Sequence, residues 1–319
     1  AVRDARDAGL IQGPRMAAAG RQITSQQGIG DNFPTWIGVP PSSMGVMVRN
    51  DSEIIQEIRD QVKAGVNLIK LAGSGLSSDE YAAFRPEEVK LAADESHRLS
   101  RPITIHARSR QSVRYAADAG VDWIMHASYM DDATLDLVLA KEIPICPAMT
   151  LLVNMLEADD VGISDLPPGV RRHIEEERDS AIRILSKFHQ SGGTLICGSE
   201  TGFSMTPYGE WHTREMGLFV KHLGLSPMEA ILCMTRNSAF TLPNYRDKIG
   251  TLTPGKYADL LVVDGAPHKD IETLHDSSNI KVIMQGGETI TPWRPIDKKR
   301  TRHGFEKVHL YTRKTLTRM

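Results

Sequence analysis

The sequence predicts an α/β protein built around a parallel sheet, and three observations lead to this expectation. Short apolar runs alternate with amphipathic stretches up to about residue 205, which is typical of βα units. The apolar runs have the length of buried strands, and the stretches between them carry apolar residues at helical spacing. After about residue 249, short apolar runs alternate with glycine-containing turns. This last change indicates a small β appendage behind the parallel sheet.

The expected helices and strands follow one another in regular alternation. In the first long helix, Ile54, Ile58 and Val62 fall on one face. Pro86 suits the first turn of the next helix, Gly120 suits the end of a later one, and Ser226 suits the N-cap before Pro227. Helices are expected over 52–64, 86–99, 111–119, 131–141, 171–190 and 211–242, and strands over 66–71, 102–106, 121–126, 143–146, 194–198, 259–263 and 280–284.

The length and composition limit the classes of protein to which the chain can belong. The 319 residues allow one large α/β domain with a small appendage, and a net charge of −2 offers nothing to attract nucleic acid or an anionic membrane. No apolar run reaches the ~18 residues of a membrane span. The three cysteines, Cys146, Cys197 and Cys233, form no CxxC pair and indicate buried thiols in a reducing compartment, the cytoplasm. The expected partner is a small-molecule substrate, and a homo-oligomer is left open.

Three expected strands end on a side chain that can take part in a metal site: Lys70, His106 and His126. Because the carboxyl ends of parallel strands meet at one face, these residues are expected to converge. A single histidine at such a position is more often a hydrogen-bonded core residue, but two histidines with a lysine favour a metal centre. Arg108 follows closely and could pair with a substrate carboxylate, although solvation at the surface is the favoured interpretation.

Lys70 admits three interpretations. It lies inside an apolar run, and burying a free ammonium group is costly. The lysine could extend outward to a carboxylate, form a Schiff base with a carbonyl substrate, or be carbamylated so that its new carboxylate bridges two metal ions.

Further candidates follow the last strand of the expected sheet. Glu200 could accept a proton from metal-bound water, and its alternative role is to cap a turn. Tyr208 and His212 come soon after it, and either could orient a substrate carbonyl. The alternative for this segment is a structural loop with Trp211 packed inside.

Taken together, these residues resemble the amidohydrolase superfamily, in the branch of imidazolonepropionase-like, prolidase-like and carbamate- or urea-cleaving hydrolases. The run at 250–260 is the most specific match and resembles the return of the chain into the family's β-sandwich. Residues 235–239 match the same C-terminal signature. Residues 2–4 look like the end of the family's second strand, and 13–21 look like its third-strand signature.

The resemblance implies a (β/α)₈ TIM barrel with a small C-terminal β-sandwich portion. It implies that Lys70 is a carboxylated bridging lysine and that His106 and His126 are metal ligands. The family's first strand carries a His-x-His pair that is absent here, so we expect that strand to lie upstream of Ala1. Glu200 stands where the family usually has an aspartate. The expected division is a barrel over 1–245, a β-sandwich appendage over 246–293 and a basic tail over 294–319.

The function that the resemblance implies is hydrolysis of an amide-like C–N bond (amide, peptide, carbamate or urea) by metal-activated water. One or two divalent ions are expected, with zinc first and manganese or cobalt as alternatives. Lys70, His106, His126 and Glu200 would form the metal site, and Glu200, Tyr208 and His212 would be the catalytic residues. Two other functions remain open: a Schiff-base aldolase acting through Lys70, and a truncated, non-catalytic relative.

Overall fold

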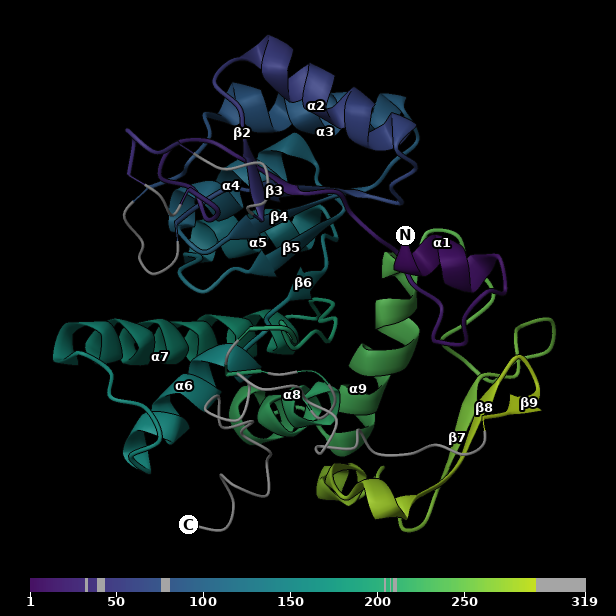
Figure 1. The fold of residues 1–319 in the computed structure, drawn as a ribbon. Coiled ribbons are helices and arrows are strands. Elements are labelled where there is room, and N and C mark those ends of the chain that lie inside the picture. Colours follow the sequence, from purple (N-terminus) through teal and green to yellow (C-terminus); the bar gives the residue numbers. More distant parts are fainter. Residues whose placement is uncertain are drawn as a thin grey trace. The chain divides into compact units, whose positions relative to one another are not determined.

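The computed structural model describes residues 1–31, 34–38, 44–75, 81–203, 205–206, 208 and 211–290 (Figure 1). The chain forms two compact units, and each is described by itself. The first unit comprises Ala1–Cys146, Gln190–Thr194 and Ala239–Arg246. The second comprises Pro147–His189, Leu195–Ser238 and Asp247–Met319.

The first unit is built on a six-stranded sheet in the order β2-β1-β3-β4-β5-β6. Every neighbouring pair in it is parallel, so the expected α/β class and parallel sheet are confirmed. The parallel direction brings the carboxyl ends of all six strands to the same edge. The strands are β1 (Gln22–Thr24), β2 (Gly45–Met47), β3 (Ile69–Ala72), β4 (Ile103–Ala107), β5 (Trp123–His126) and β6 (Ile145–Cys146).

The helices of this unit contact one another in chain order, α2 with α3, α3 with α4, and α4 with α5. They begin and end where local signals indicate. Asn50 caps α2 by accepting a hydrogen bond from the Glu53 amide, and Gly120 ends α4 in the left-handed region at φ 75°. The helices are α1 (Val2–Asp7), α2 (Asp51–Lys63), α3 (Pro86–Arg98), α4 (Arg110–Ala119) and α5 (Asp132–Ala140).

Two expectations for the first unit need correction, and two strands are added. Residues 2–4 lie in helix α1 and do not end a strand. β3 begins at Ile69, later than expected, because the Val66 amide still bonds to the Gln61 carbonyl at the end of α2. Val66 and Asn67 therefore link the helix to the strand, and Leu68 forms an isolated parallel bridge with Ala19. Strands β1 and β2 were not expected, since three-residue strands are too short to show a period.

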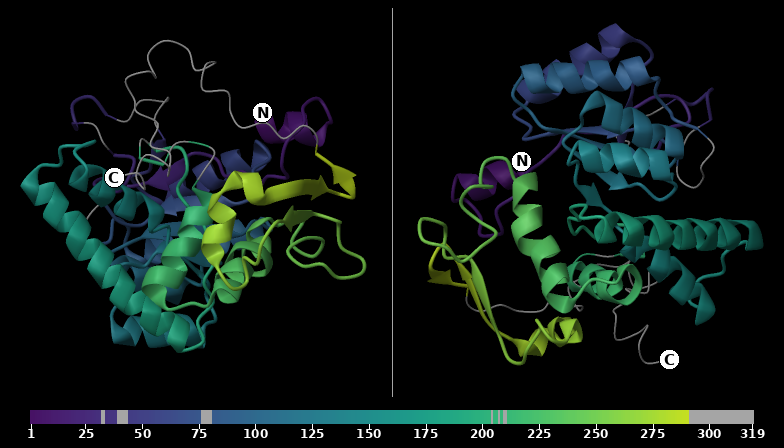
Figure 2. Two further views of the ribbon diagram at one scale, coloured as in Figure 1. Left: turned by 90° about the horizontal axis from the view of Figure 1, so that it is seen from below. Right: turned by 180° about the vertical axis from the view of Figure 1, so that it is seen from behind.

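The second unit is mainly helical and ends in an antiparallel sheet in the order β7-β8-β9. Figure 2 shows β7 and β8 side by side. Its helices are α6 (Thr150–Asp160), α7 (Pro168–Gln190), α8 (His212–Leu218) and α9 (Pro227–Leu232). Its strands are β7 (Leu260–Val263), β8 (Ile280–Gln285) and β9 (Glu288–Thr289). Its π-helical turns are Phe219–Leu223 and Cys233–Asn237, and its 3₁₀ turns include Ile271–His275 and Ser277–Asn279. A further 3₁₀ turn, Ser238–Thr241, begins in this unit and ends in the first.

The strand expected over 194–198 is reduced to a single β-bridge position at Leu195, and two side chains bond to the main chain of this segment. Asn237 Nδ2 donates to the Leu195 carbonyl at 3.0 Å, and the main-chain amide of Cys197 donates to Ser238 Oγ at 3.1 Å. Side chains thus take main-chain groups that a neighbouring strand would otherwise use.

The single helix expected over 211–242 is interrupted. Gly224 adopts φ 79° and ends the first part, and Ser226 caps α9 as expected, with Pro227 in its first turn. Helix α6 was not expected.

The cysteines lie largely inside the protein. Cys146 and Cys233 are buried, and Cys197 is half-buried. Among the described helices, none is long and apolar enough to cross a bilayer. The basic tail over 294–319 lies outside the described residues.

Candidate metal centre

Lys70, His106 and His126 lie on the three adjoining strands β3, β4 and β5. In the sheet register, Lys70 pairs with Thr104, and His106 pairs with Met125. Because paired and alternate residues of a pleated sheet share a face, Lys70 and His106 point to the same side. Lys70 Nζ lies 2.7 Å from Met125 Sδ, which agrees with this placement.

His126 reaches the same side by a different route. It pairs with Ala107, so a regular pleat would point it to the face opposite His106. The chain instead turns into the left-handed region at His126 (φ 74°) and Ala127 (φ 56°). The His126 ring then lies with its centroid 4.7 Å from that of His106, at an interplanar angle of 71°. Two consecutive non-glycine residues in this region mark a strained strand end, as often found at functional sites.

The environment of His106 favours its neutral form. Both histidines are 2% exposed. Burial lowers the pKa of His106 well below its usual 6.5, and the positive charges of Arg108 and Lys70 lower it further. His106 Nε2 lies 3.0 Å from the Gly75 carbonyl, and since a carbonyl only accepts, Nε2 carries the hydrogen. Nδ1 is then the nitrogen that offers a lone pair, and neutral imidazole is the form that binds metal ions.

These residues fit a divalent metal by their donor chemistry. Two buried imidazoles meet edge to face at an interplanar angle of 71°, and Lys70 shares their side of the sheet. Within the described ranges, no three histidine, cysteine or acidic side chains gather closely enough to hold a metal ion unaided.

The expectation that solvent surrounds Arg108 is wrong. Arg108 is 4% exposed. Its amide donates to Ser74 Oγ at 3.0 Å, and its carbonyl accepts from the Tyr129 amide at 3.0 Å. The buried guanidinium group instead adds positive charge beside His106.

The other candidates, Glu200, Tyr208 and His212, belong to the second unit. Glu200 adopts the left-handed conformation at φ 51°. Tyr208 is 77% exposed. Its hydroxyl oxygen lies close to Gly202, at 3.1 Å from the position that a Cβ atom on this glycine would take. His212 begins α8 and is exposed, whereas Trp211 is buried at 1% exposure.

Glu215, one turn into α8, was not singled out from the sequence. It is fully buried and accepts hydrogen bonds from the amides of Met149 and Thr150, both at 2.8 Å, and from the Thr150 hydroxyl. Burial raises the pKa of Glu215 to about 7, against the lowering effect of these hydrogen bonds. A glutamate in an amphipathic helix ordinarily faces solvent, so no local signal announces this role.

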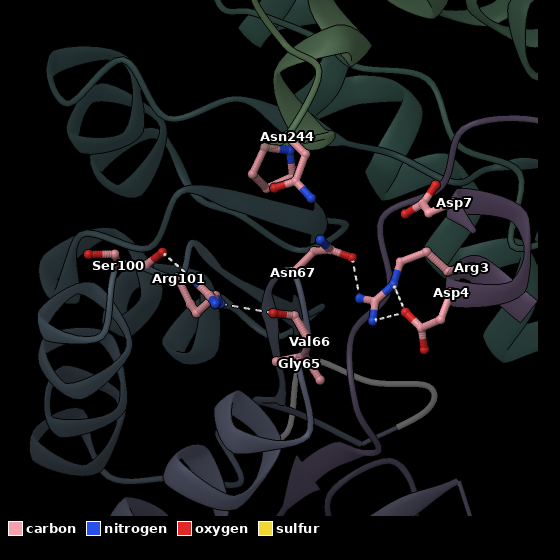
Figure 3. A pocket seen from close by; sticks show the side chains of 10 residues that line it. Arg3, Asp4, Asp7, Gly65, Val66, Asn67, Ser100, Arg101 and Asn244 are labelled. Atoms are coloured by element: carbon pink, nitrogen blue, oxygen red, sulfur yellow. Dashed lines mark hydrogen bonds and ion pairs between the residues drawn. The ribbon is translucent and has the colours of Figure 1, made fainter. Parts of the chain in front are cut away.

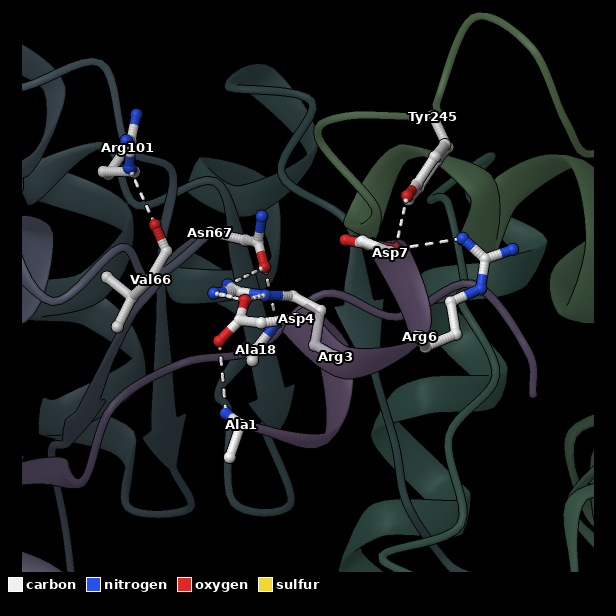
Figure 4. A network of polar contacts seen from close by, with 10 residues as sticks. All are labelled: Ala1, Arg3, Asp4, Arg6, Asp7, Ala18, Val66, Asn67, Arg101 and Tyr245. Atoms are coloured by element: carbon white, nitrogen blue, oxygen red, sulfur yellow. Dashed lines mark hydrogen bonds and ion pairs between the residues drawn. The ribbon is translucent and has the colours of Figure 1, made fainter. Parts of the chain in front are cut away.

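A separate polar pocket of about 310 Å³ lies in the first unit, where the chain enters β3 and β4 (Figure 3). Arg3 donates to Asn67 Oδ1 at 2.6 Å and to Asp4, while Arg101 donates to the Val66 carbonyl at 2.8 Å (Figure 4). The pocket is therefore at the amino ends of the strands, opposite the edge that carries the histidines. Its arginines are already engaged by neighbouring groups.

Comparisons with known proteins indicate the family of this chain. The chain matches the amidohydrolase family over residues 1–290. It is 25% identical over 309 residues to the ochratoxinase of Aspergillus niger, covering 89% of this chain and 63% of that protein. It is 23% identical over 216 residues to the imidazolonepropionase of Deinococcus deserti, covering 66% of this chain and 47% of that protein. The chain thus spans less than two thirds of these relatives.

Solved structures show which fold the chain shares. The crystal structure of a Xaa-Pro dipeptidase with bound methionine superposes with a TM-score of 0.78 at 26% identity, covering 91% of this chain and 71% of that chain. The crystal structure of A. niger ochratoxinase superposes with a TM-score of 0.79 at 22% identity, covering 90% and 68%. With a family match over nearly the whole described chain and a shared fold, this protein belongs to the amidohydrolase family.

Proposed function

We propose that the complete protein is a metal-dependent hydrolase that cleaves an amide-like C–N bond of a small molecule. The observation that carries the proposal is the meeting of the two buried imidazoles of His106 and His126 on the side of the sheet to which Lys70 points. The neutral imidazole of His106 and the buried imidazole of His126 suit a divalent metal, and family membership with ochratoxinase and dipeptidase relatives supports C–N bond hydrolysis.

His106, His126 and Lys70 in a carbamylated form would hold the metal. When bound, a divalent metal supplies Lewis-acid polarisation of the substrate carbonyl and lowers the pKa of coordinated water. Zinc is the first candidate, and manganese or cobalt are alternatives.

Glu200 is the proposed general base. It takes the proton from the attacking water and returns it to the leaving nitrogen, so that the amine departs as a neutral group. Glutamate is one methylene longer than the aspartate that the family resemblance leads one to expect, which suits proton transfer more readily than direct metal ligation. Tyr208 and His212 would orient the substrate carbonyl.

The proposal extends to the architecture. The six parallel strands would belong to a (β/α)₈ barrel over 1–245, and β7–β9 would belong to a β-sandwich over 246–293. The likeness to amidohydrolase structures supports this arrangement.

The experiment is hydrolysis of a panel of Xaa-Pro dipeptides, N-acyl amino acids and phenylureas by the full chain after zinc supplementation. We expect turnover of at least one class, its loss on treatment with a chelator, and its recovery when metal is restored. Glu200→Gln should reduce kcat by about 100-fold or more. Turnover that is unaffected by thorough metal removal would contradict the proposal.

A second candidate is a Schiff-base aldolase, which the half-buried position of Lys70 on β3 favours. Borohydride reduction in the presence of a carbonyl substrate traps a Schiff base, and a mass increase on Lys70 would support this alternative. A chain that neither binds metal after supplementation nor forms the adduct would be a non-catalytic relative.

A further inference from the structure

The turn that follows Glu200 is closed by its own hydrogen bonds. The Gly202 amide donates to the Thr206 carbonyl at 2.8 Å, and the Thr206 amide donates to the Phe203 carbonyl at 3.0 Å. Glu200 itself lies in the left-handed region at φ 51°. A glutamate keeps this conformation only where its surroundings hold it there.

Thr206 supplies the contact that reaches Glu200. It is fully buried, and its hydroxyl donates to the Glu200 carbonyl at 2.8 Å. With its amide and carbonyl bonded inside the turn, every polar group of Thr206 is used to hold this segment. The hydrogen bond from Thr206 thereby fixes the main chain of Glu200 relative to the rest of the turn.

Asn154 joins the turn to a helix. It lies in α6, is fully buried, and its Nδ2 donates to the Met205 carbonyl at 2.8 Å. Its Oδ1 has no hydrogen-bond partner in the part of the chain that the structure describes. The start of α6 is in turn fixed by Glu215 through the amides of Met149 and Thr150.

We propose that Thr206 and Asn154 are positioning residues for the Glu200 carboxylate. Thr206 holds the main chain of Glu200, and Asn154 fixes the turn that carries Thr206 to α6. The inference rests on the proposed function, in which Glu200 is the general base. It goes further by assigning the geometry of that base to two buried polar residues that act through the main chain of the turn. A displacement of about 1 Å in a catalytic group can cost about 100-fold in rate, so loss of this support is visible in kinetics.

The experiment compares Thr206→Val with Thr206→Ser in the full chain, using the fastest Xaa-Pro dipeptide, N-acyl amino acid or phenylurea of the panel. Valine keeps the shape of threonine and removes the hydroxyl, whereas serine keeps the hydroxyl. We expect Thr206→Val to lower kcat by about tenfold or more with KM changed by less than about threefold, and Thr206→Ser to stay within about threefold of wild type. The same losses in both variants would overturn the inference.

The Glu200→Gln background provides the decisive comparison. If Thr206 acts through Glu200, Thr206→Val causes no further loss once the base is gone, because the two changes remove one function. If the losses of kcat from the two single changes multiply in the double variant, the inference is overturned, while Glu200 remains the proposed base. Full activity in Glu200→Gln would overturn the proposed role of Glu200, and with it the inference.

Asn154→Leu is a second variant, so that the test does not depend on whether Thr206→Val folds. Leucine has a similar size, removes the donor to Met205, and also removes a buried carbonyl oxygen that has no described partner. We expect kcat to fall by about tenfold with KM preserved, and a thermal unfolding midpoint within a few degrees of wild type. Unchanged kcat in a folded Asn154→Leu would remove Asn154 from the assignment.

Discussion

The ring of His126 lies 4.7 Å from the ring of His106, although the register of β4 and β5 assigns the two residues to opposite faces of the sheet. The left-handed turn at His126 and Ala127 is what brings them together. The pair therefore depends on the backbone of two residues as much as on the presence of two histidines.

This dependence gives a prediction for Ala127. Ala127→Val should destabilise the fold by roughly 1–3 kcal/mol and reduce metal retention, because a β-branched residue is a true outlier at φ 56° and the site is fully buried. Ala127→Gly, which accepts the conformation freely, should keep the metal. Urea unfolding and metal analysis measure both quantities. Equal metal retention in the two variants would mean that the turn does not set the histidine pair.

Lys70 gives a second prediction. Lys70→Ala should abolish metal-dependent activity in the complete protein, and short carboxylic acids such as propionate should restore part of it. An added carboxylate can occupy the place of a bridging carbamate, whereas it cannot replace a Schiff-base amine. Rates measured with increasing propionate test the difference. Full activity in Lys70→Ala without any additive would rule out both roles of the lysine.

Gly73 gives a third prediction. Its amide donates to the His106 carbonyl at 2.8 Å, and an added Cβ would lie 2.6 Å from Ile105 Cδ1 and 3.0 Å from the His106 carbonyl oxygen. Gly73→Ala should therefore push β3 away from β4 and cost roughly 1–3 kcal/mol of unfolding free energy. Gly169→Ala in the first turns of α7, where a Cβ would meet no atom within 4 Å, is the matched control and should leave stability unchanged or raise it. Chemical unfolding of the two variants side by side decides between them, and equal stability would contradict the close approach.

Glu215 gives a prediction for pH. Its pKa is raised from 4.5 to about 7, so between these values the folded state holds a proton that the unfolded state has released. The free energy of unfolding should therefore fall as pH rises through this window, by roughly 3 kcal/mol at about 1.4 kcal/mol per pKa unit, and level off above it. Other groups titrate in the same range, and Glu215→Gln isolates this one. The stability difference between wild type and Glu215→Gln should shrink as pH rises from 4.5 to 7, and a constant difference would show that Glu215 does not titrate there.

Local signals in the sequence were sufficient for much of the fold. Pro86, Gly120 and Ser226 mark helix ends because each acts on the residues beside it, and the structure has α3, α4 and α9 at these places. The strand expected over 194–198 is reduced to one bridge position at Leu195, and the side chains of Asn237 and Ser238, about 40 residues away, bond to main-chain groups of this segment. Such a contact leaves no trace in a local pattern.

The candidate site could likewise be predicted from the sequence only in part. His106 and His126 could be named because strand-end histidines are recognisable, but the turn that makes them meet could not, since neither His126 nor Ala127 is a residue that favours positive φ strongly. Burial of Arg108 and Glu215 was equally hidden, because a charged side chain is expected in solvent until its neighbours are known. The role of Lys70 stays a prediction.

Metal content tests the central claim most directly. The full chain, supplemented with zinc and then freed of loosely held metal, should retain about one zinc ion per chain or more by elemental mass spectrometry. The double variant His106→Ala/His126→Ala should lose that ion, with circular dichroism confirming that it is folded. Equal zinc in the two proteins, or none in the wild-type chain, would contradict the assignment of His106 and His126 as metal ligands.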